Sequence, residues 1–284
     1  MLLSMRRWLH VPTAALLFGC VCVSISLSST AFSQSSIPPV DKQFAQLAAS
    51  HRILLFGELH GTQEMPAYFA ALVSQLARRD QVIKVGIEHP LDQAGDLNGY
   101  LQSAGSSKDQ QLLLGNGYWN ATHQDGRTSY AMFTLVEQLR VLKSEGYDVE
   151  LFAFDDQQAE NRDKALAANI SRVYQNNPEA LHLVITGNIH SRFKRGAPWN
   201  PDFLPMGFFL RESVGASLVT SVEFSHDGGN AWLCTPECKV TELAKPKTPT
   251  ERFTLRKKAP SYHHDFALNV GTIEVSLPTL ERRD

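Results

Sequence analysis

The sequence predicts an α/β fold, with a mainly parallel sheet, helices on both of its faces and a C-terminal β-hairpin extension. In the first two thirds of the chain, short apolar runs alternate with longer segments whose apolar residues recur every three or four positions. These are the patterns of buried strands and amphipathic helices. Strands that alternate with helices imply right-handed crossovers and parallel pairing. In the last third, short strand-like runs flank Asp227-Gly228-Gly229, a sequence typical of a hairpin turn.

The α/β part has four expected strands, at 52–57, 82–88, 149–154 and 181–186. Each is a compact apolar run. Helices are expected at about 41–49, 65–76 and 132–142, and after the third strand up to about 174. The segment 91–124 has five glycines and less regular apolar spacing, so we expect short helices there and a loop that covers a site. Three further strands are expected near the C-terminus, at 217–224, 231–234 and 273–277.

The first 33 residues differ from the rest of the chain. Arg6 and Arg7 are the only Lys, Arg, Asp or Glu side chains before Asp41, an apolar run spans 11–27, and mostly small residues follow to Ser33. This is the pattern of a secretory signal peptide, which we expect to be cleaved after about Ser33. A transmembrane anchor is the alternative, but it takes about 20 strongly apolar residues, and this run is diluted by proline, serine and threonine.

A second interpretation of the N-terminus is a lipobox at 17–20, with lipid attached to Cys20. Phe18 is bulky for such a motif, and the apolar run continues beyond Cys20. We therefore favour cleavage over lipidation and expect a periplasmic or secreted protein. Residues 34–284 are then a single α/β domain.

The charge balance excludes several partners. The chain has 27 Lys and Arg against 29 Asp and Glu, a net charge of −2, so it carries no electrostatic footprint for nucleic acid or for an anionic membrane surface. Cys234 and Cys238 are the cysteines beyond the N-terminal segment, and such a pair in an oxidising compartment predicts a disulfide. Half of a metal site is the alternative, but the second cysteine pair of a cysteine-rich cage is missing.

Acidic and histidine residues follow the four predicted strands. Glu58 and His60 follow the first, Glu88 the second, Asp155 the third and His190 the fourth. The carboxyl ends of parallel strands meet at one edge of a sheet, where ligands bind, so we expect these side chains in one catalytic site. Two carboxylates and two imidazoles, those of Glu58, His60, Glu88 and His190, suit a divalent transition metal such as Zn, Mn or Fe. Its bound water would be the nucleophile.

Other uses of these residues stay open. One carboxylate could instead stay outside the metal shell and act as a general base. Asp155 is also a suitable helix N-cap. The alternative for His190 is a hydrogen bond to a buried backbone carbonyl, and the alternative for Glu88 is an ion pair with an arginine. Tyr118 and Arg127, in the irregular segment, are candidates for substrate binding, since an arginine clamps a carboxylate or phosphate. The alternative is that Tyr118 only fills space with other aromatic residues and that Arg127 lies on the surface.

Short motifs at the same strand ends resemble those of the superfamily that contains erythromycin esterase, ChaN and Tiki proteins. The run 54–62, Leu-Leu-Phe-Gly-Glu-Leu-His-Gly-Thr, is followed in the same order by Gly86-Ile87-Glu88, Phe154-Asp155 and Gly187-Asn188-Ile189-His190. The resemblance covers about residues 50–192 and is strongest to exported ChaN-like proteins. It implies an α/β fold with a site at the strand ends.

The resemblance implies two functions. In erythromycin-esterase-like members, residues matching Glu58, His60, Glu88 and His190 carry out hydrolysis, and Tiki-like members are metal-dependent proteases. This implies an exported hydrolase that cleaves an ester or amide bond of a small molecule or peptide. The Tiki-like members add a metal-dependent version of this enzyme. ChaN-like members bind haem through a tyrosine, which implies the alternative of a haem- or iron-binding uptake protein without turnover. Gly61 stands here where ChaN-like proteins have Asp, and no tyrosine of this chain is matched to the haem ligand. A third interpretation is an envelope protein whose ancestral site is now structural.

Overall fold

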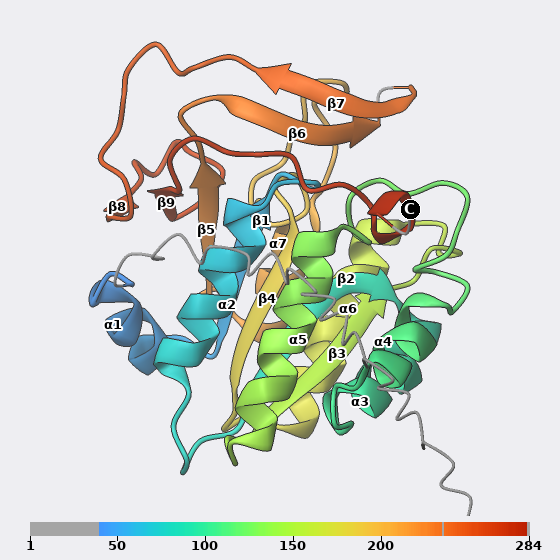
Figure 1. The fold of residues 1–284 in the computed structure, drawn as a ribbon. Coiled ribbons are helices and arrows are strands. Elements are labelled where there is room, and N and C mark those ends of the chain that lie inside the picture. The colour runs from blue at the N-terminus through green and yellow to red at the C-terminus, as the bar shows by residue number, and fades with distance from the viewer. Residues whose placement is uncertain (1–39, 235, 283–284) are drawn as a thin grey trace, which may run out of the picture. The chain divides into compact units, whose positions relative to one another are not determined.

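A seven-stranded sheet organises the chain (Figure 1). The computed structural model describes residues 40–234 and 236–282, and the strands of this sheet lie in the order β3-β2-β4-β1-β5-β9-β8. They are β1 (Ile53–Glu58), β2 (Ile83–Pro90), β3 (Val149–Asp155), β4 (Leu181–Gly187), β5 (Val219–Ser225), β8 (Leu255–Lys257) and β9 (Phe266–Asn269). Neighbouring strands pair in parallel, except that β8 is antiparallel to β9. The predicted α/β fold with a mainly parallel sheet is confirmed.

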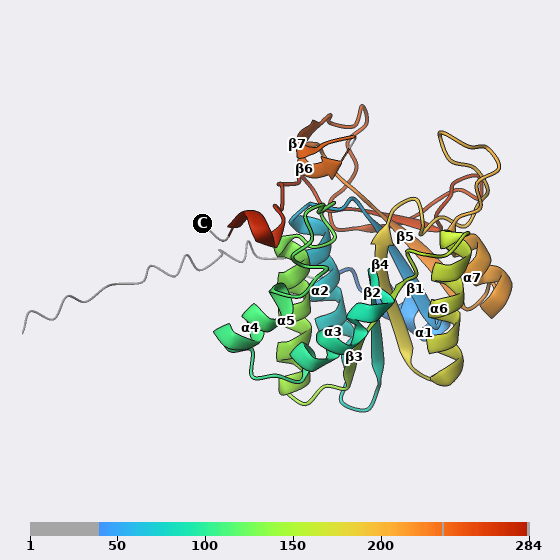
Figure 2. The ribbon, with the colours of Figure 1, turned by 90° about the vertical axis from the view of Figure 1, so that its right-hand side faces the viewer.

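Helices cover both faces of the sheet. Figure 2 shows α6 (Arg162–Asn176) and α7 (Met206–Val214) on one face, with α2 (Glu64–Leu76) and α5 (Tyr130–Ser144) on the other. The remaining helical elements are α1 (Gln43–Ser50), α3 (Ala94–Leu101), α4 (Ser107–Leu114) and the 3-10 turns η1 (Leu91–Gln93) and η2 (Thr279–Arg282). The four helices that the apolar spacing predicts all form, and 91–124 folds as short helices and loops.

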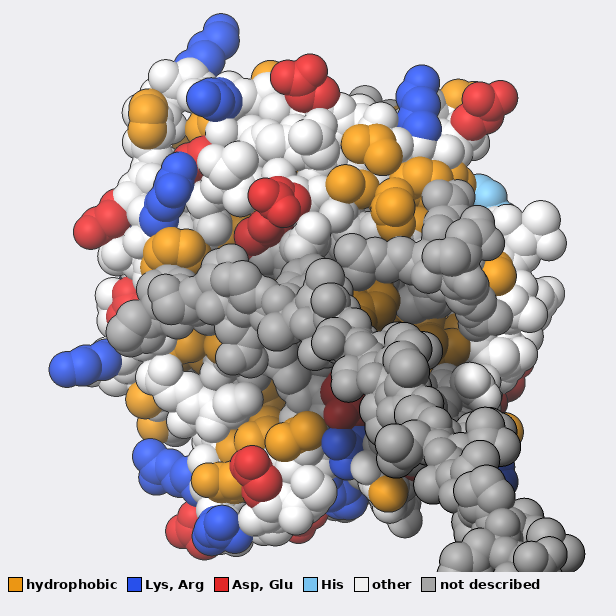
Figure 3. All heavy atoms as spheres, viewed as in Figure 1, with side chains coloured by type: hydrophobic (Ala, Val, Ile, Leu, Met, Phe, Trp, Pro, Cys, Tyr) orange, Lys and Arg blue, Asp and Glu red, His pale blue; other side chains and the backbone are white. Residues whose placement is uncertain are grey.

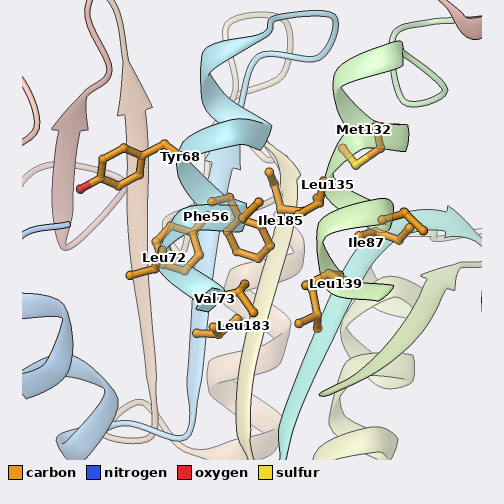
Figure 4. Close-up of a cluster of buried hydrophobic side chains, with 14 of the residues drawn as sticks. Phe56, Tyr68, Leu72, Val73, Ile87, Met132, Leu135, Leu139, Leu183 and Ile185 are labelled. Carbon is orange, nitrogen blue, oxygen red and sulfur yellow. The ribbon is translucent and has the colours of Figure 1, made fainter. Parts of the chain in front are cut away.

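Alternate residues of the strands feed two separate cores. In β1, Leu54 and Phe56 belong to the cluster under α2 and α5, whereas Ile53 and Leu55 belong to the cluster under α6 and α7. Figure 4 shows the larger of the two clusters, between α2, α5 and the sheet. Successive side chains of a strand leave on opposite faces, so a strand that is covered on both faces is apolar throughout. This is why the four predicted strands read as continuous apolar runs.

Side-chain caps fix where two helices near the carboxyl edge of the sheet begin. The Ser129 side chain accepts a hydrogen bond from Met132 N at the start of α5, and Asn161 accepts one from Lys164 N at the start of α6. Each such cap stabilises a helix start by about 1 kcal/mol. Because the chain enters α5 from the loop of Arg127 and enters α6 at once after Asn161, these caps also fix the backbone that borders the strand ends.

The C-terminal hairpin forms, but with a different turn from the one the sequence predicts. It pairs β6 (Gly229–Cys234) with β7 (Cys238–Leu243), and Cys234 and Cys238 form the predicted disulfide at its end. Asp227-Gly228-Gly229 instead connects β5 to β6, which lie in different sheets. Glycine suits either connection, since Gly228 and Gly229 both have positive φ, and local sequence does not distinguish a hairpin from a change of sheet.

The prediction of a strand at 273–277 is also wrong, because this segment forms single bridges and not a strand. Ile273 bridges to Gly229, and Val275 bridges to Thr62. Its partners come from two different parts of the chain, so no continuous ladder develops. Conversely, β7, β8 and β9 form where the sequence predicts no strand. β8 and β9 have only three and four residues, too few for an alternating pattern to be detected.

The described residues, 40–234 and 236–282, belong to one compact unit. Figure 3 shows Lys and Arg interspersed with Asp and Glu on the face that it draws, in keeping with the near-balanced charge. Within 40–234 and 236–282, no helix is long and apolar enough to cross a membrane. The predicted signal peptide at 1–33 and the lipobox alternative at Cys20 lie outside the described residues.

Candidate functional site

The carboxyl ends of β3, β2, β4 and β1 are neighbours in the sheet, and the five predicted catalytic residues lie there. Glu58 ends β1, Glu88 lies near the end of β2, Asp155 ends β3, and His60 and His190 follow β1 and β4. The three carboxylates are buried, whereas both histidine side chains are partly exposed. The fold therefore brings these residues into one cluster that is open to the surface at the imidazoles.

Glu58 and His60 form the first histidine–carboxylate pair. Glu58 Oε1 lies 2.8 Å from His60 Nδ1, because residues two apart in extended chain point to the same side. The other ring nitrogen, Nε2, lies 3.8 Å from Glu88 Oε2. Burial lowers the pKa of His60 and Arg127 acts in the same direction, but the hydrogen bond to Glu58 and the charges of Glu58 and Glu88 outweigh both. The pKa of His60 is raised as a result.

Asp163 and His190 form a second pair, in which Asp163 is not a predicted residue. Asp163 Oδ1 lies 2.8 Å from His190 Nδ1 and accepts a hydrogen bond from Met206 N at 2.7 Å. His190 Nε2 lies 3.1 Å from Arg162 Nη1 and 3.9 Å from Glu88 Oε1. A guanidinium only donates, so we assign His190 as the Nδ1–H tautomer with its Nε2 lone pair toward Arg162. Burial lowers the pKa of His190, but Glu88 and Asp163 outweigh burial and Arg162 and raise it.

Glu88 is the carboxylate shared by the two pairs. Its Oε2 accepts hydrogen bonds from Thr186 Oγ1 at 2.6 Å and from Gly187 N at 2.8 Å. Its Oε1 accepts from Arg162 Nη2 at 2.6 Å and from Arg127 Nη1 at 3.4 Å. Burial alone would raise the pKa of Glu88, but the charges of the two histidines and the two arginines hold it well below its ordinary value. Glu88 is therefore ionised and fixed in place.

Two arginines are held by carboxylates at the rim of the cluster. Arg162 donates from Nε and Nη2 to Asp155, at 2.8 Å each. Arg127 donates from Nη1 to Asp155 at 2.8 Å, and from Nε and Nη2 to Asp125 at 2.6 to 3.0 Å. The side chain of Arg127 is 14% exposed and that of Arg162 is 32% exposed. Arg127, a predicted clamp for a substrate anion, thus has its nitrogens bonded within the protein, and Arg162 is the more open guanidinium.

Asp125, Arg162 and Asp163 are members of the cluster that sequence reasoning missed. Arg162 and Asp163 open α6, directly after the loop that follows β3. The sequence contains a signal for Arg162 and Asp163. A loop at the carboxyl end of a parallel strand borders the site, and the loop between β3 and α6 carries charged residues up to the start of the helix. Asp125 lies two residues before Arg127 in the irregular segment, where no periodic pattern indicates which side chains point inward.

His89 and Tyr118 lie beside the cluster. His89 Nε2 lies 2.8 Å from Arg127 O, and burial lowers the pKa of His89 to about 4, so the neutral ring donates to that carbonyl. The ring centroid of His89 is 4.8 Å from that of Tyr118 and 5.0 Å from that of Trp119. The Tyr118 hydroxyl is buried and has no hydrogen-bond partner in the described part of the chain. Burial raises the pKa of Tyr118, which keeps it a neutral donor.

His60, His190 and Glu88 crowd around Gly187. A Cβ built on Gly187 would lie 3.1 Å from His60 Nε2, 3.4 Å from His190 Cδ2 and 3.7 Å from Glu88 Oε2. Gly187 ends β4, and its N–H is bonded to Glu88. Both rings and the shared carboxylate therefore meet at this glycine, and a side chain there would press against His60.

The groups around Glu88 fit a divalent metal ion poorly. The Glu88 oxygens already accept four hydrogen bonds, two of them from guanidinium groups, and an ion would be repelled by these fixed positive charges. Among the described residues, the group of three that could share an ion is His123, Cys234 and Cys238, whose ligand atoms lie within 4.8 Å of one another. The two sulfur atoms are joined in the disulfide, so thiolate ligands arise there only on reduction. A metal on the four predicted ligands stays a prediction.

Comparison with solved structures shows the same fold at low sequence identity. A mutant of the erythromycin esterase EreC in its open conformation matches with a TM-score of 0.55 and 13% identity, over 72% of this chain and 78% of that chain. A Bacillus cereus protein matches with a TM-score of 0.55 and 11% identity, over 84% of this chain and 92% of that chain. ChaN of Campylobacter jejuni, solved with haem, has a TM-score of only 0.40 at 11% identity, over 64% of this chain and 84% of that chain, and supports no argument here.

No family model matches the chain, and no curated protein sequence does. The structural likenesses show the fold alone. They agree with the superfamily that the motifs at the strand ends resemble.

Proposed function

We propose that the protein is an exported hydrolase that cleaves an ester or amide bond of a small molecule or peptide, with His60 as its general base. The observation that carries this proposal is the His60–Glu58 pair, because Glu58 binds Nδ1 and leaves Nε2 of a partly exposed ring beside Glu88. The fold likeness to an erythromycin esterase favours hydrolysis. The signal-peptide pattern of the N-terminus favours export.

His60 would take a proton from water at Nε2. Glu58 accepts the hydrogen bond from Nδ1–H, which leaves Nε2 with its lone pair in the neutral ring. As the water oxygen bonds to the substrate carbonyl carbon, its proton passes to Nε2, and the imidazolium is stabilised by Glu58 and Glu88. The same proton then passes to the leaving oxygen or nitrogen as its bond to carbon breaks. The remaining product is a carboxylic acid, so atoms and charge balance.

Arg162 would stabilise the carbonyl oxygen as it becomes negative. Its Nη1 lies 3.1 Å from His190 Nε2, and its Nε and Nη2 donate to Asp155. A fixed donor aimed at developing charge is a large source of rate in acyl transfer. His190, bonded to Asp163, would then be a positioning residue for Arg162 and not a second base.

Tyr118 and Arg127 would have different tasks. The buried hydroxyl of Tyr118 has no partner among the described residues, and a buried donor without a partner is costly, so we assign it a hydrogen bond to bound substrate. Arg127 joins Asp125, Asp155 and Glu88. It would act on catalysis through these carboxylates by keeping Glu88 ionised and in place.

The experiment is an assay of the purified mature protein against a panel of esters, lactones and peptides, with and without added Zn, Mn or Fe. We expect turnover that does not depend on added metal and that is lost in His60→Ala. The matched control is His51→Ala, whose ring bonds Ser50 and Leu47 O at the end of α1. A native protein that turns over no member of the panel under any condition contradicts the proposal.

The haem-binding alternative is tested with the same preparation. If the protein is a hydrolase, titration with haemin should give no tyrosine-dependent Soret shift. A tyrosine-dependent shift together with absent turnover would favour the uptake protein. Activity that appears only with added metal and disappears with chelator would instead support the metal set predicted from the sequence.

A further inference from the structure

Trp232 of the β6–β7 hairpin contacts both loops that carry residues of the site. Its backbone N–H donates to Gly61 O at 3.0 Å, one residue after His60. Its indole Nε1 donates to Gln124 O at 2.9 Å, three residues before Arg127. Trp232 is only 9% exposed, so both hydrogen bonds are shielded from water and hard to replace by solvent.

The two loops are packed backbone against backbone beside Trp232. A Cβ on Gly61 would lie 2.4 Å from Trp232 O, and a Cβ on Gly126 would lie 2.6 Å from Gly61 N. Both glycines have positive φ, +76° and +92°, which other residues rarely adopt. Because no side chain lies between these backbones, a displacement of Trp232 would be passed directly to the loops of His60 and Arg127.

The hairpin that carries Trp232 is itself fixed to the rest of the domain. The disulfide of Cys234 and Cys238 closes its far end, and Gly229 at its near end bridges to Ile273. The segment after Ile273 returns to the same loop, where Ser276 N donates to Gly61 O at 2.9 Å. The C-terminal third therefore encloses the backbone on which the site is built.

We infer that Trp232 is a positioning residue, which sets the relative place of His60 and Arg127 through its two N–H donors. Without the indole N–H, Gln124 O loses this hydrogen bond, and the loop that carries Asp125 and Arg127 is held near Glu88 by fewer contacts. The kinetic consequence rests on the proposed function. The structural consequence, the order of Arg127, does not.

The test compares Trp232→Phe with Trp199→Phe in the full mature chain. Phenylalanine at 232 retains an aromatic ring and the backbone N–H but lacks the indole donor, and Trp199 is 66% exposed, which makes it the matched control. The first measurement is hydrogen exchange of the Arg127 Nε–H in ¹H–¹⁵N spectra, since this group donates to Asp125 in the native protein. We expect exchange about tenfold faster in Trp232→Phe and unchanged in the control.

The second measurement is steady-state kinetics on the best substrate of the panel. We expect kcat to fall about tenfold with KM nearly unchanged, since Arg127 acts through Glu88 and a small misplacement lowers the rate of the chemical step. A merely structural role of Trp232 would lower the unfolding temperature without this split between kcat and KM.

The outcomes separate the two proposals. Unchanged Arg127 Nε–H exchange in folded Trp232→Phe overturns the positioning role, whatever the kinetics. Should Trp232→Phe not fold, the double variant Cys234→Ser/Cys238→Ser takes its place, with faster Arg127 exchange supporting the role and unchanged exchange overturning it. Faster exchange in Trp232→Phe combined with no turnover by the native protein supports the positioning role and contradicts the proposed function.

Discussion

The two histidine–carboxylate pairs differ in what faces the second ring nitrogen. Nε2 of both rings lies near Glu88, at 3.8 Å for His60 and 3.9 Å for His190, but that of His190 also lies 3.1 Å from the guanidinium of Arg162. A proton on His60 Nε2 gains an attractive neighbour, but a proton on His190 Nε2 also has to displace a cation. We therefore assign the base to His60 and an orienting role to His190.

Substitution of His60 should cause the largest loss of activity, because it removes the proposed general base. In His60→Ala we expect kcat/KM to fall about 10³-fold, the usual contribution of a general base. His190→Ala should lose less, since Asp155 still holds Arg162. Steady-state kinetics of the two variants measures the difference. A larger loss in His190→Ala would reverse the assigned roles.

Glu88→Gln removes the charge that both pairs share. Arg162 and Arg127 keep Asp155 and Asp125 but lose the third carboxylate, so the free energy of unfolding at about pH 7 should fall by about 2 kcal/mol. Because the pKa of Glu88 is lowered in the fold, its stabilisation is present above about pH 4.5 and is lost as pH falls through the folded pKa. Denaturant unfolding at about pH 7 and about pH 3 should show a smaller difference in acid. An equal difference at both pH values would mean that the charge of Glu88 is not the cause.

Gly187→Ala crowds the point where the two pairs meet. The new methyl group would lie 3.1 Å from His60 Nε2 and would displace that ring, so we expect kcat/KM to fall about 10²-fold. The unfolding temperature should also fall, since Gly187 is buried and overpacking costs about 1–3 kcal/mol. The matched control is Gly99→Ala, where a Cβ meets nothing within 4 Å. Native activity in folded Gly187→Ala would place the reaction elsewhere.

Glu58→Gln has the smallest expected effect, and it tests directly whether His60 is the titrating base. The amide oxygen can still accept from His60 Nδ1, but the charge that raises the pKa of His60 is gone, so that pKa should fall. Since the neutral ring is the base, activity rises as pH passes the His60 pKa, and the acid limb of the pH–rate profile should move to lower pH. The plateau should fall about tenfold, because the weaker base accepts a proton less readily. An acid limb that does not move would show that His60 is not the titrating group.

The part of the site that sequence predicts is the part built from strand ends. Glu58, Glu88 and Asp155 each follow an apolar run, and parallel pairing then brings them together. Arg162 and Asp163 reach the site from the start of α6. The charged loop before this helix indicates that it borders the site, but which of its residues point inward depends on tertiary packing and not on local sequence.

The C-terminal third was the least predictable region of the fold. The bond from Trp232 to Gln124 joins residues 108 apart, and Asp125 lies in a loop whose place is set by that bond. The last two strands of the sheet, β8 and β9, are too short to show a period. Turn chemistry at Asp227 indicated a change of direction correctly but not which strands it joins.

The most direct test of the two unequal pairs is the protonation of the histidine rings themselves. Long-range ¹H–¹⁵N spectra from about pH 9 to about pH 5 follow each ring nitrogen separately. We expect His60 and His190 both to begin as Nδ1–H tautomers, and His60 Nε2 to take up its proton at the higher pH. Proton uptake at His190 Nε2 first, or a neutral His60 protonated at Nε2, would contradict the account.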